Sequence, residues 1–527
     1  MEVTANKPRP RSVVTRRRTP LEGVFSAFVA MAFASTAHAI DWRLQPSIGS
    51  MATYTDNANQ SASNPEDALI LSVTPDFTLQ SQGSRRVQAT LQYGLTGVAR
   101  FGEDESTDLN HRLNAAGKAE LVEDFLFIDG NARISQELIS LFGSPADAEI
   151  NDSNRATVGT YSISPYIQKR LGTFADALAR YTNSGAIFEN DTASDSSVNS
   201  FSAGLTSGTR FDDLSWGLNY SIRKASNHDA ADTTFERASA TVGYALTRKF
   251  RVFGTVGRDW NDYLSTTDID GSSYSAGFGW APTRRTSVEA SVGERYFGRT
   301  YSLSGSHRTR MSRWTARYYE DVSDITQQLL EQSGRIFWVC NGSLFETPDI
   351  NPPAGQTNCS GPITAGQLAL FFSNYGVSTA DLIAAGLLNI ATANGVYIIK
   401  GLTAGVSWDI GRLGFGLSAH DTRRLYQELG DAQDHVQGVT GSVSYRLSPQ
   451  TTANSSLSLT RTRADALLSS SGIARDDDLI GFSLGLNRSF ADNLSGALTY
   501  RHTQRDSNEA DADYEENRLT ASVNMRF

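Results

Sequence analysis

The sequence contains only two cysteines in 527 residues, Cys340 and Cys359. Two cysteines cannot form a multi-disulfide scaffold or a four-cysteine metal site. No stretch reaches 18 consecutive apolar residues, which excludes membrane-spanning helices. The net charge of −10 argues against a nucleic-acid-binding protein. Aromatic and aliphatic residues are nevertheless plentiful, so the composition is that of a folded chain.

Recognisable catalytic motifs are also missing. The sequence holds no GxSxG, HExxH or P-loop segment, and no GxGxxG segment with its acidic partner. Histidine is scarce, with seven residues, and neither His307 nor His420 has an obvious Ser or carboxylate partner nearby in the sequence. We therefore expect no catalytic residues, no cofactor and no metal site.

Residues 1–39 have the pattern of a secretory signal peptide. Five arginines between Arg9 and Arg18 precede an apolar run over 24–34, and Ala37-His38-Ala39 forms an A-x-A cleavage site. The apolar run is too short to span a membrane. Cleavage after Ala39 removes six of the 47 basic and two of the 57 acidic residues, so the net charge becomes −14. We expect an exported, acidic mature chain over 40–527.

From residue 40 onward, apolar and polar residues alternate in segment after segment. In the last segment, the apolar positions are Leu519, Ala521, Val523, Met525 and Phe527. Such alternation places one face of a strand in an apolar medium and the other in a polar one. A soluble β-sandwich would not sustain it through some twenty strands, whereas a transmembrane barrel needs it in every strand. The final segment, which ends on Phe, resembles the signal that the barrel assembly machinery reads.

The lengths of the predicted turns alternate as well. Ten short turns lie near residues 83, 124, 172, 213, 249, 283, 310, 411, 449 and 492, and most interleaved connections are longer and richer in Asp, Asn and Ser. Short periplasmic turns and long extracellular loops are typical of outer-membrane barrels of Gram-negative bacteria. Ten short turns and the two termini give 11 hairpins. The sequence thus predicts an all-β fold, one large antiparallel transmembrane β-barrel of about 22 strands (20–24), with both termini in the periplasm.

Aromatic residues fall towards the ends of these strands or on their apolar faces. The examples are Trp42, Trp216, Trp280, Trp314, Trp408, Tyr220, Tyr318, Tyr445 and Tyr500. Amphipathic rings favour the level of the lipid headgroups and form girdles there. The general preference of aromatic residues for strands explains any single one of them equally well.

Residues 323–394 form the longest segment without alternation. Helical patterns cover 324–332, 364–372 and 379–392, and the two cysteines lie between the first and second of these. Because both cysteines lie in one exported loop, we expect a disulfide. By turn parity this insertion is extracellular. It could fold inward as a plug, stand outward and bind a partner, or simply decorate the surface.

One stretch before the insertion is unusually basic. Its candidate residues for a cationic strip are Arg295, Arg308, Arg310, Arg313 and Arg317. Alternation with Trp314 and Tyr318 predicts that Arg313 and Arg317 face the lumen. Such a strip would select anionic solutes or an acidic polymer. The alternative is that these arginines pair with carboxylates and only stiffen the wall. Acidic runs, among them 103–105 and 476–478, are expected in solvated surface loops.

Four segments resemble one known family. They are Tyr54-Thr55-Asp56-Asn57, residues 119–129, Ser162-Ile163-Ser164-Pro165-Tyr166, and the block His307-Arg308-x-Arg310-x-x-x-Trp314-x-x-x-Tyr318. They are similar to segments of the large outer-membrane barrels associated with the PEP-CTERM/exosortase protein-sorting system, which is found alongside exopolysaccharide loci. The resemblance implies an outer-membrane location and a link to surface polysaccharide or exported proteins. It transfers no active-site residue, and the cysteine-containing insertion departs from the family.

Three functions are compatible with these observations. The first is a channel or export component linked to exopolysaccharide or to the PEP-CTERM/exosortase system. The second is a non-conducting structural or binding barrel whose loops hold surface polymer or sorted proteins. The third is an outer-membrane hydrolase. The expected partners are outer-membrane lipids, lipopolysaccharide, the barrel assembly machinery, and exopolysaccharide or export-system proteins, with no nucleic acid. A TonB-dependent transporter is not expected, because alternation starts within a few residues of Ala39 and leaves no room for a plug domain.

Overall fold

The computed structural model describes residues 41–103, 105–138, 140, 142–143, 154–189, 195–227, 231–334, 336–340, 343–347, 359–364, 395–430, 432–469 and 472–527. The predicted signal peptide lies outside these residues. Residues 40–527 form one compact unit. Within the described residues, no helix has the length and apolar character required to cross a membrane.

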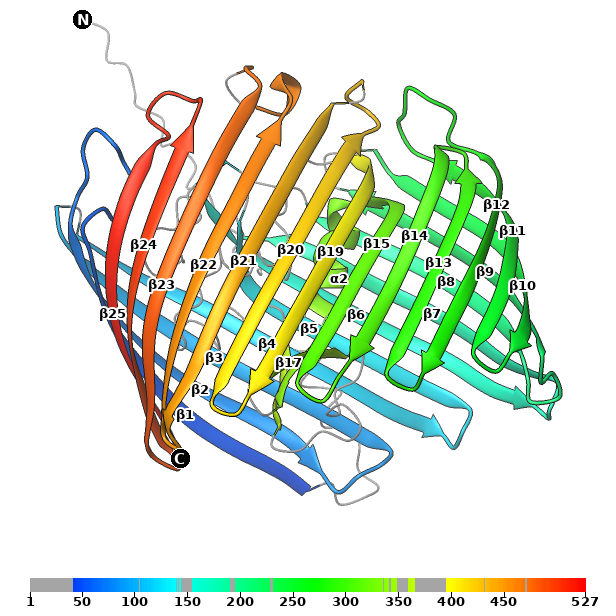
Figure 1. The fold of residues 1–527 in the computed structure, drawn as a ribbon, viewed down its shortest axis with the longest axis horizontal. Helices are drawn as coiled ribbons and strands as arrows, with labels where there is room; N and C mark the ends of the chain where they lie inside the picture. The colour runs from blue at the N-terminus through cyan, green and yellow to red at the C-terminus, as the bar shows by residue number, and fades with distance from the viewer. Residues whose placement is uncertain are drawn as a thin grey trace, which may run out of the picture. The chain divides into compact units, whose positions relative to one another are not determined.

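Twenty-two antiparallel strands form one closed sheet (Figure 1). The first fifteen are β1 (Asp41–Thr55), β2 (Ala68–Gln82), β3 (Val87–Phe101), β4 (Ser106–Val122), β5 (Leu126–Leu138), β6 (Arg155–Leu171), β7 (Ala175–Phe188), β8 (Ser196–Ser207), β9 (Leu214–Asn227), β10 (Thr233–Thr247), β11 (Phe250–Asp262), β12 (Gly271–Thr283), β13 (Thr286–Arg295), β14 (Gly298–Arg308) and β15 (Ser312–Asp324). The other seven are β19 (Val396–Ile410), β20 (Leu413–Tyr426), β21 (Gln433–Ser448), β22 (Thr451–Ala464), β23 (Arg475–Ala491), β24 (Leu494–Ser507) and β25 (Tyr514–Arg526). Strands β15 and β19 pair across the insertion, and β1 pairs with β25 to close the ring. The predicted barrel and its strand number are confirmed.

The two ends of the barrel differ in their connections. All ten predicted short turns join strands at one end, which we name the short-turn end. The connections at the other end, the long-loop end, are mostly longer, except that only Tyr296 and Phe297 join β13 to β14. Gly298 follows them with a φ of 112°, a conformation that a side chain would strain. Both ends of the strand series lie at the short-turn end, because Asp41 pairs with Gln82 and Arg526 donates its N–H to Asn493.

Alternate side chains of every strand face outward, and most of them are apolar. On β25, Leu519 and Val523 are 48% and 46% exposed, and on β23 Leu484 is 52% exposed. A soluble protein rarely leaves an apolar surface of this extent in water. In lipid, a closed barrel exposes apolar side chains and leaves no unpaired strand edge. The chain is therefore a transmembrane β-barrel of the outer-membrane type.

Aromatic residues border this apolar surface at both ends, as predicted. Trp42, Trp216, Trp280, Trp314 and Trp408 lie on the outer face within a few residues of the short-turn end. The rings of Trp314 and Trp408 meet edge to face, with centroids 5.4 Å apart. Nearer the long-loop end, outward tyrosines donate their hydroxyls to polar residues of the same or the next strand: Tyr181 to Asn199, Tyr220 to Glu236, Tyr274 to Glu294, Tyr318 to Glu320 and Tyr500 to Asn517. The two sets of rings bound the apolar belt.

The insertion begins with a helix and continues with a small sheet. Helix α2 (Ile325–Gly334) confirms the predicted helix over 324–332. The sheet, which the sequence did not predict, consists of β16 (Ile336–Cys340), β17 (Ser343–Thr347) and β18 (Cys359–Thr364). Its register places Cys340 directly opposite Cys359. Such partners lie about 4.5–5.5 Å apart at Cα, a separation that a disulfide bridges. The other two predicted helices lie outside the described residues, apart from Thr364. A 3₁₀ turn, η1 (Ala466–Leu468), lies between β22 and β23.

Candidate functional site

The lumen wall is built from the polar positions of the strands. Small hydroxyl residues pair across neighbouring strands, as Ser164 does with Thr182 at 2.8 Å. Charged residues pair in the same way, and Arg424 on β20 contacts Asp434 on β21 at 2.9 Å. Because these bonds link neighbouring strands, they stiffen the ring and leave it hydrophilic inside. A polar interior of this width suits the passage or binding of hydrophilic molecules.

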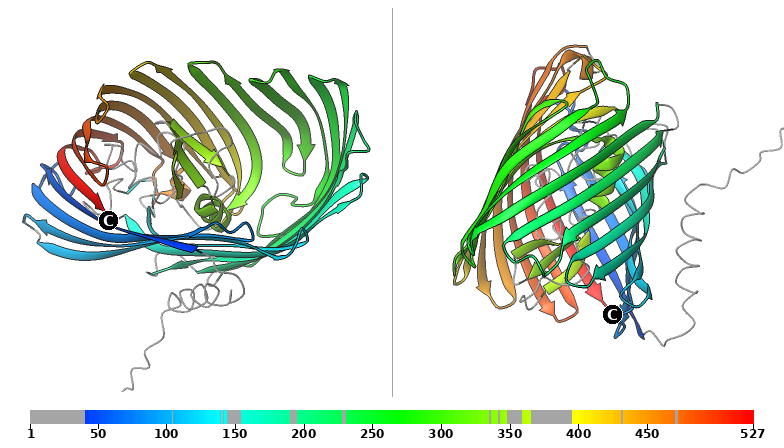
Figure 2. Two further views of the ribbon diagram at one scale, coloured as in Figure 1. Left: turned by 90° about the horizontal axis from the view of Figure 1, so that it is seen from below. Right: turned by 90° about the vertical axis from the view of Figure 1, so that its right-hand side faces the viewer.

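Helix α2 lies inside the ring of strands, where Figure 2 shows it together with the sheet of β16–β18. The helix contacts β15 on one side and β5, β6 and β7 on the other. Its first residue, Ile325, packs against a buried cluster of Ala156, Val158 and Ala186 on β6 and β7. The carboxylate of Asp324 accepts a 2.8 Å hydrogen bond from the N–H of Gln327, which caps the start of the helix. The described start of the insertion thus lies inward, which matches one of the three options left open by the sequence.

Three polar contacts attach α2 to distant parts of the wall. Thr326 donates to the hydroxyl of Ser196 on β8 at 2.9 Å, with both groups buried. Gln328 accepts from the hydroxyl of Tyr397 on β19 at 2.6 Å. The capping residue Asp324 also pairs with Arg223 on β9. Through these contacts the helix links strands β8, β9 and β19, which are not all neighbours in the sheet, and Ile325 packs against β6 and β7.

A second inward contact lies at the long-loop end. The carbonyl of Phe142, in the β5–β6 loop, accepts hydrogen bonds from Arg505 on β24 at 2.7 Å and from Arg475 on β23 at 3.2 Å. The guanidinium of Arg475 also lies 4.6 Å from the centre of the Phe142 ring. Asp477 lies between the two arginines and pairs with both. We call this cluster of Phe142, Arg475, Asp477 and Arg505 the latch. It holds the β5–β6 loop to β23 and β24, strands with which β5 and β6 do not pair.

The structure divides the predicted cationic strip. Arg295 lies at the long-loop end, where it pairs with Asp259 at 2.9 Å and with Asp321 at 2.7 Å. Beside this group, the hydroxyls of Tyr263 and Tyr296 lie 3.1 Å apart, and burial raises the pKa of both phenols. Arg295 therefore pairs with carboxylates and stiffens the wall, as the alternative interpretation of the strip predicts.

The other four arginines gather near the short-turn end of β14 and β15. Arg308 is the register partner of Arg313, and Arg317 lies opposite Ser304 on the same lumen-facing side. The turn between the two strands carries Arg310. Within the described ranges, no ion pair involves Arg308, Arg310 or Arg317. Beyond Ser304, in register with Arg317, the carboxylate of Glu289 is bound by Arg251.

Sequence reasoning missed the residues that hold the inward segments. Ser196 and Tyr397 carry no signal beyond ordinary strand alternation. The acidic run 476–478 was expected in a loop, which was wrong, because it lies in β23. Alternation within that run is the signal that was overlooked: Asp477 faces the lumen arginines, whereas Asp476 faces outward to Arg461.

The proposed assembly signal lies on β25. Leu519, Ala521 and Val523 are exposed on its outer face, and the N–H of Phe527 donates to the carbonyl of Pro46 at 2.9 Å. The final residue thus ties the last strand to the first. Recognition by the assembly machinery stays a prediction.

Known proteins can be compared with this chain by sequence and by structure. No protein-family model matches the chain, and no curated protein matches it significantly. Among solved structures, the siderophore receptor PirA from Acinetobacter baumannii aligns with a TM-score of 0.48 at 10% identity, over 93% of this chain and 81% of that one. The FrpB iron transporter from Neisseria meningitidis aligns with a TM-score of 0.49 at 10% identity, over 92% and 82%. At such values these likenesses transfer neither ligand nor activity to this chain.

Proposed function

We propose that the protein is a gated outer-membrane channel that passes an anionic polymer or solute, with α2 as the gate. The observation that carries this proposal is the position of α2 inside the lumen, where polar contacts of Asp324, Thr326 and Gln328 attach it to β9, β8 and β19. At the start of α2, Ile325 packs against the small cluster of Ala156, Val158 and Ala186. A helix held in this way is released at modest cost.

The charge of the lumen supports an anionic cargo. Arg308, Arg313 and Arg317 gather near one mouth, and Glu289, which is in register with Arg317 beyond Ser304, is bound by Arg251. Fixed positive charge in a narrow aqueous path concentrates anions and excludes cations. The short-turn end is the periplasmic end in this proposal, so exported cargo meets the arginines first. The resemblance to the PEP-CTERM/exosortase barrels supports surface polysaccharide as the cargo.

The experiment is single-channel conductance of the mature chain in a planar bilayer, with and without the insertion. The register suggests the deletion, because Asp324 pairs with Val396 and a two-residue Asn-Gly turn can join them. We expect small or rare openings from the intact chain and large steady conductance from the shortened one. Addition of an anionic polysaccharide fragment should block the current, and a neutral fragment of the same length should not.

A non-conducting binding barrel is the second candidate, favoured by the latch of the β5–β6 loop at the long-loop end. It predicts that neither the intact nor the shortened chain conducts, while heat-modifiable gel mobility shows that both are folded. That result would overturn the channel proposal.

A further inference from the structure

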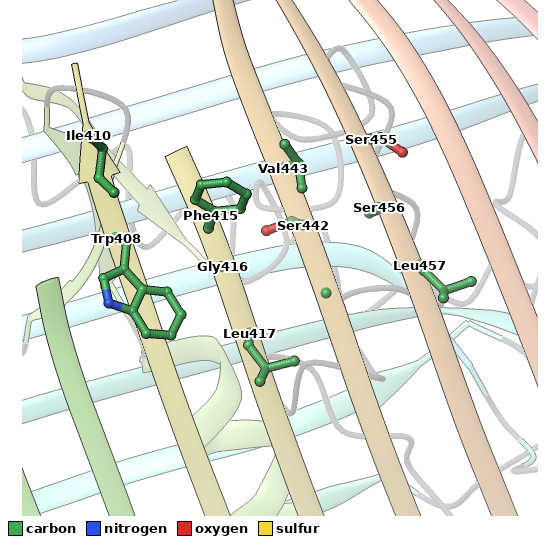
Figure 3. Close-up of a pocket in the computed structure, with 11 residues that line it drawn as sticks. Trp408, Ile410, Phe415, Gly416, Leu417, Ser442, Val443, Ser455, Ser456 and Leu457 are labelled. Carbon is green, nitrogen blue, oxygen red and sulfur yellow. The ribbon is translucent and has the colours of Figure 1, made fainter. Parts of the chain in front are cut away.

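A groove interrupts the outer face over strands β19 to β22 (Figure 3). It has a volume of about 580 Å³, within the range of about 300–1,000 Å³ that ligand sites occupy. Trp408, Phe415 and Leu417 line one side, and Val443 and Leu457 line the other. Each of these side chains belongs to the outward-facing set of its strand, so the groove opens to the membrane and not to the lumen.

The floor of the groove exists because two outward positions carry little side chain. Gly441 lies in register between Leu417 and Leu457, and a Cβ added to it would meet nothing within 4 Å. Neither the backbone nor packing within the barrel therefore requires glycine there. Beside it, Ser455 donates its hydroxyl to the carbonyl of Ser483 at 3.0 Å. The small residues thus leave an apolar hollow whose polar group is satisfied from within the sheet.

A glycine inside a strand weakens it, and often marks a site where a ligand approaches closely. The groove lies inside the apolar belt, between the tryptophans of the short-turn end and the tyrosines above them. Only hydrocarbon surrounds the barrel at this level. An acyl chain is the occupant that matches an apolar groove with no free donor or acceptor.

We infer that this groove is a binding site for one acyl chain of a glycerophospholipid. The groove lies in the leaflet next to the short-turn end, because Trp408 and Phe415 lie within three residues of the turn between β19 and β20. The assignment to phospholipid and not lipopolysaccharide rests on the proposed periplasmic orientation of the short-turn end. The site itself is independent of whether the barrel conducts. Trp408 forms the rim, where its ring also contacts Trp314.

The test is native mass spectrometry of the full mature barrel, released from detergent that contains increasing amounts of phosphatidylethanolamine. Gly441→Leu fills the floor. Gly97→Leu is the matched control, because Gly97 is also outward, also lies between apolar register partners, Val73 and Leu109, and also has free space around its Cβ. We expect one tightly retained phospholipid on the parent and on G97L, and at least a threefold loss of that adduct on G441L.

Equal retention on all three chains, or equal loss on both variants, would overturn the proposal. Retention of lipopolysaccharide in place of phosphatidylethanolamine, when both are offered, would overturn the assignment to phospholipid while leaving the channel proposal intact. Trp408→Ala removes the wall without filling the floor, and should also lower retention. This second variant decides the question should G441L fail to show the heat-modifiable mobility of a folded barrel.

Discussion

The hydroxyl of Tyr397 on β19 donates a 2.6 Å hydrogen bond to the side-chain carbonyl of Gln328 on α2, and both residues are buried. This bond ties the inward helix to the strand that follows the insertion. Thr326 ties the same helix to Ser196 on β8. These two bonds, together with the pairing of Asp324 and Arg223, hold the helix in the lumen.

Loss of both bonds should open the channel. Tyr397→Phe combined with Thr326→Val removes two buried hydrogen bonds, each worth about 1 kcal/mol, so the ratio of open to closed channels should rise roughly thirtyfold. Single-channel recording measures this ratio. Thr241→Val is the control, because Thr241 forms a similar hydroxyl pair with Thr255 within the wall and does not contact α2. A similar rise in the control would assign the effect to general loosening of the barrel.

Asp477 should be far more important for stability than its neighbour in sequence. Asp477→Ala leaves Arg475 and Arg505 without their buried counter-charge, at a cost of about 3–5 kcal/mol. Asp476→Ala breaks exposed pairs with Arg461 and Arg463, each worth about 0–1 kcal/mol. The temperature at which heat-modifiable gel mobility is lost should fall for the first variant and stay nearly unchanged for the second. The β5–β6 loop should also become accessible to protease in the Asp477 variant alone. Equal behaviour of the two variants would contradict the latch.

The arginines of β14 and β15 should set ion selectivity. Replacement of Arg308, Arg313 and Arg317 by Gln in the chain shortened between Asp324 and Val396 should shift the zero-current potential in a salt gradient from anion towards cation preference. The double variant Arg251→Gln, Glu289→Gln removes a neighbouring ion pair without changing net charge, and should leave the potential unchanged. Selectivity that persists in the triple variant would show that the selective region lies elsewhere.

The two cysteines should be oxidised to a disulfide. Antiparallel pairing of Cys340 with Cys359 predicts that both resist alkylation until a reductant is added. Mass spectrometry of the exported chain, alkylated with and without reductant, measures this directly. Such a bond would stabilise the small sheet by about 3 kcal/mol in the chain-entropy model. Alkylation of both thiols without reductant would refute the prediction.

The sequence alone determined the wall of this protein. Period-two alternation states which side chains face outward, since successive residues of any strand point to opposite faces. The ten short turns are equally local, and together these signals predicted the 22 strands, the apolar belt and the lumen-facing Arg313 and Arg317. The helix at the start of the insertion could also be predicted, because its pattern lies within ten residues.

Only the tertiary structure decided what the lumen contains. Whether α2 points inward depends on residues such as Ser196, which lies 130 positions away in the chain and reaches the helix only because the ring closes. Tertiary structure also separates Arg295 from the other four arginines of the predicted cationic strip. Arg295 on β13 meets Asp259 on β11 and Asp321 on β15, each two strands away, whereas Glu289 is bound by Arg251. Alternation fixes the face of a side chain, but closure and register choose its partner.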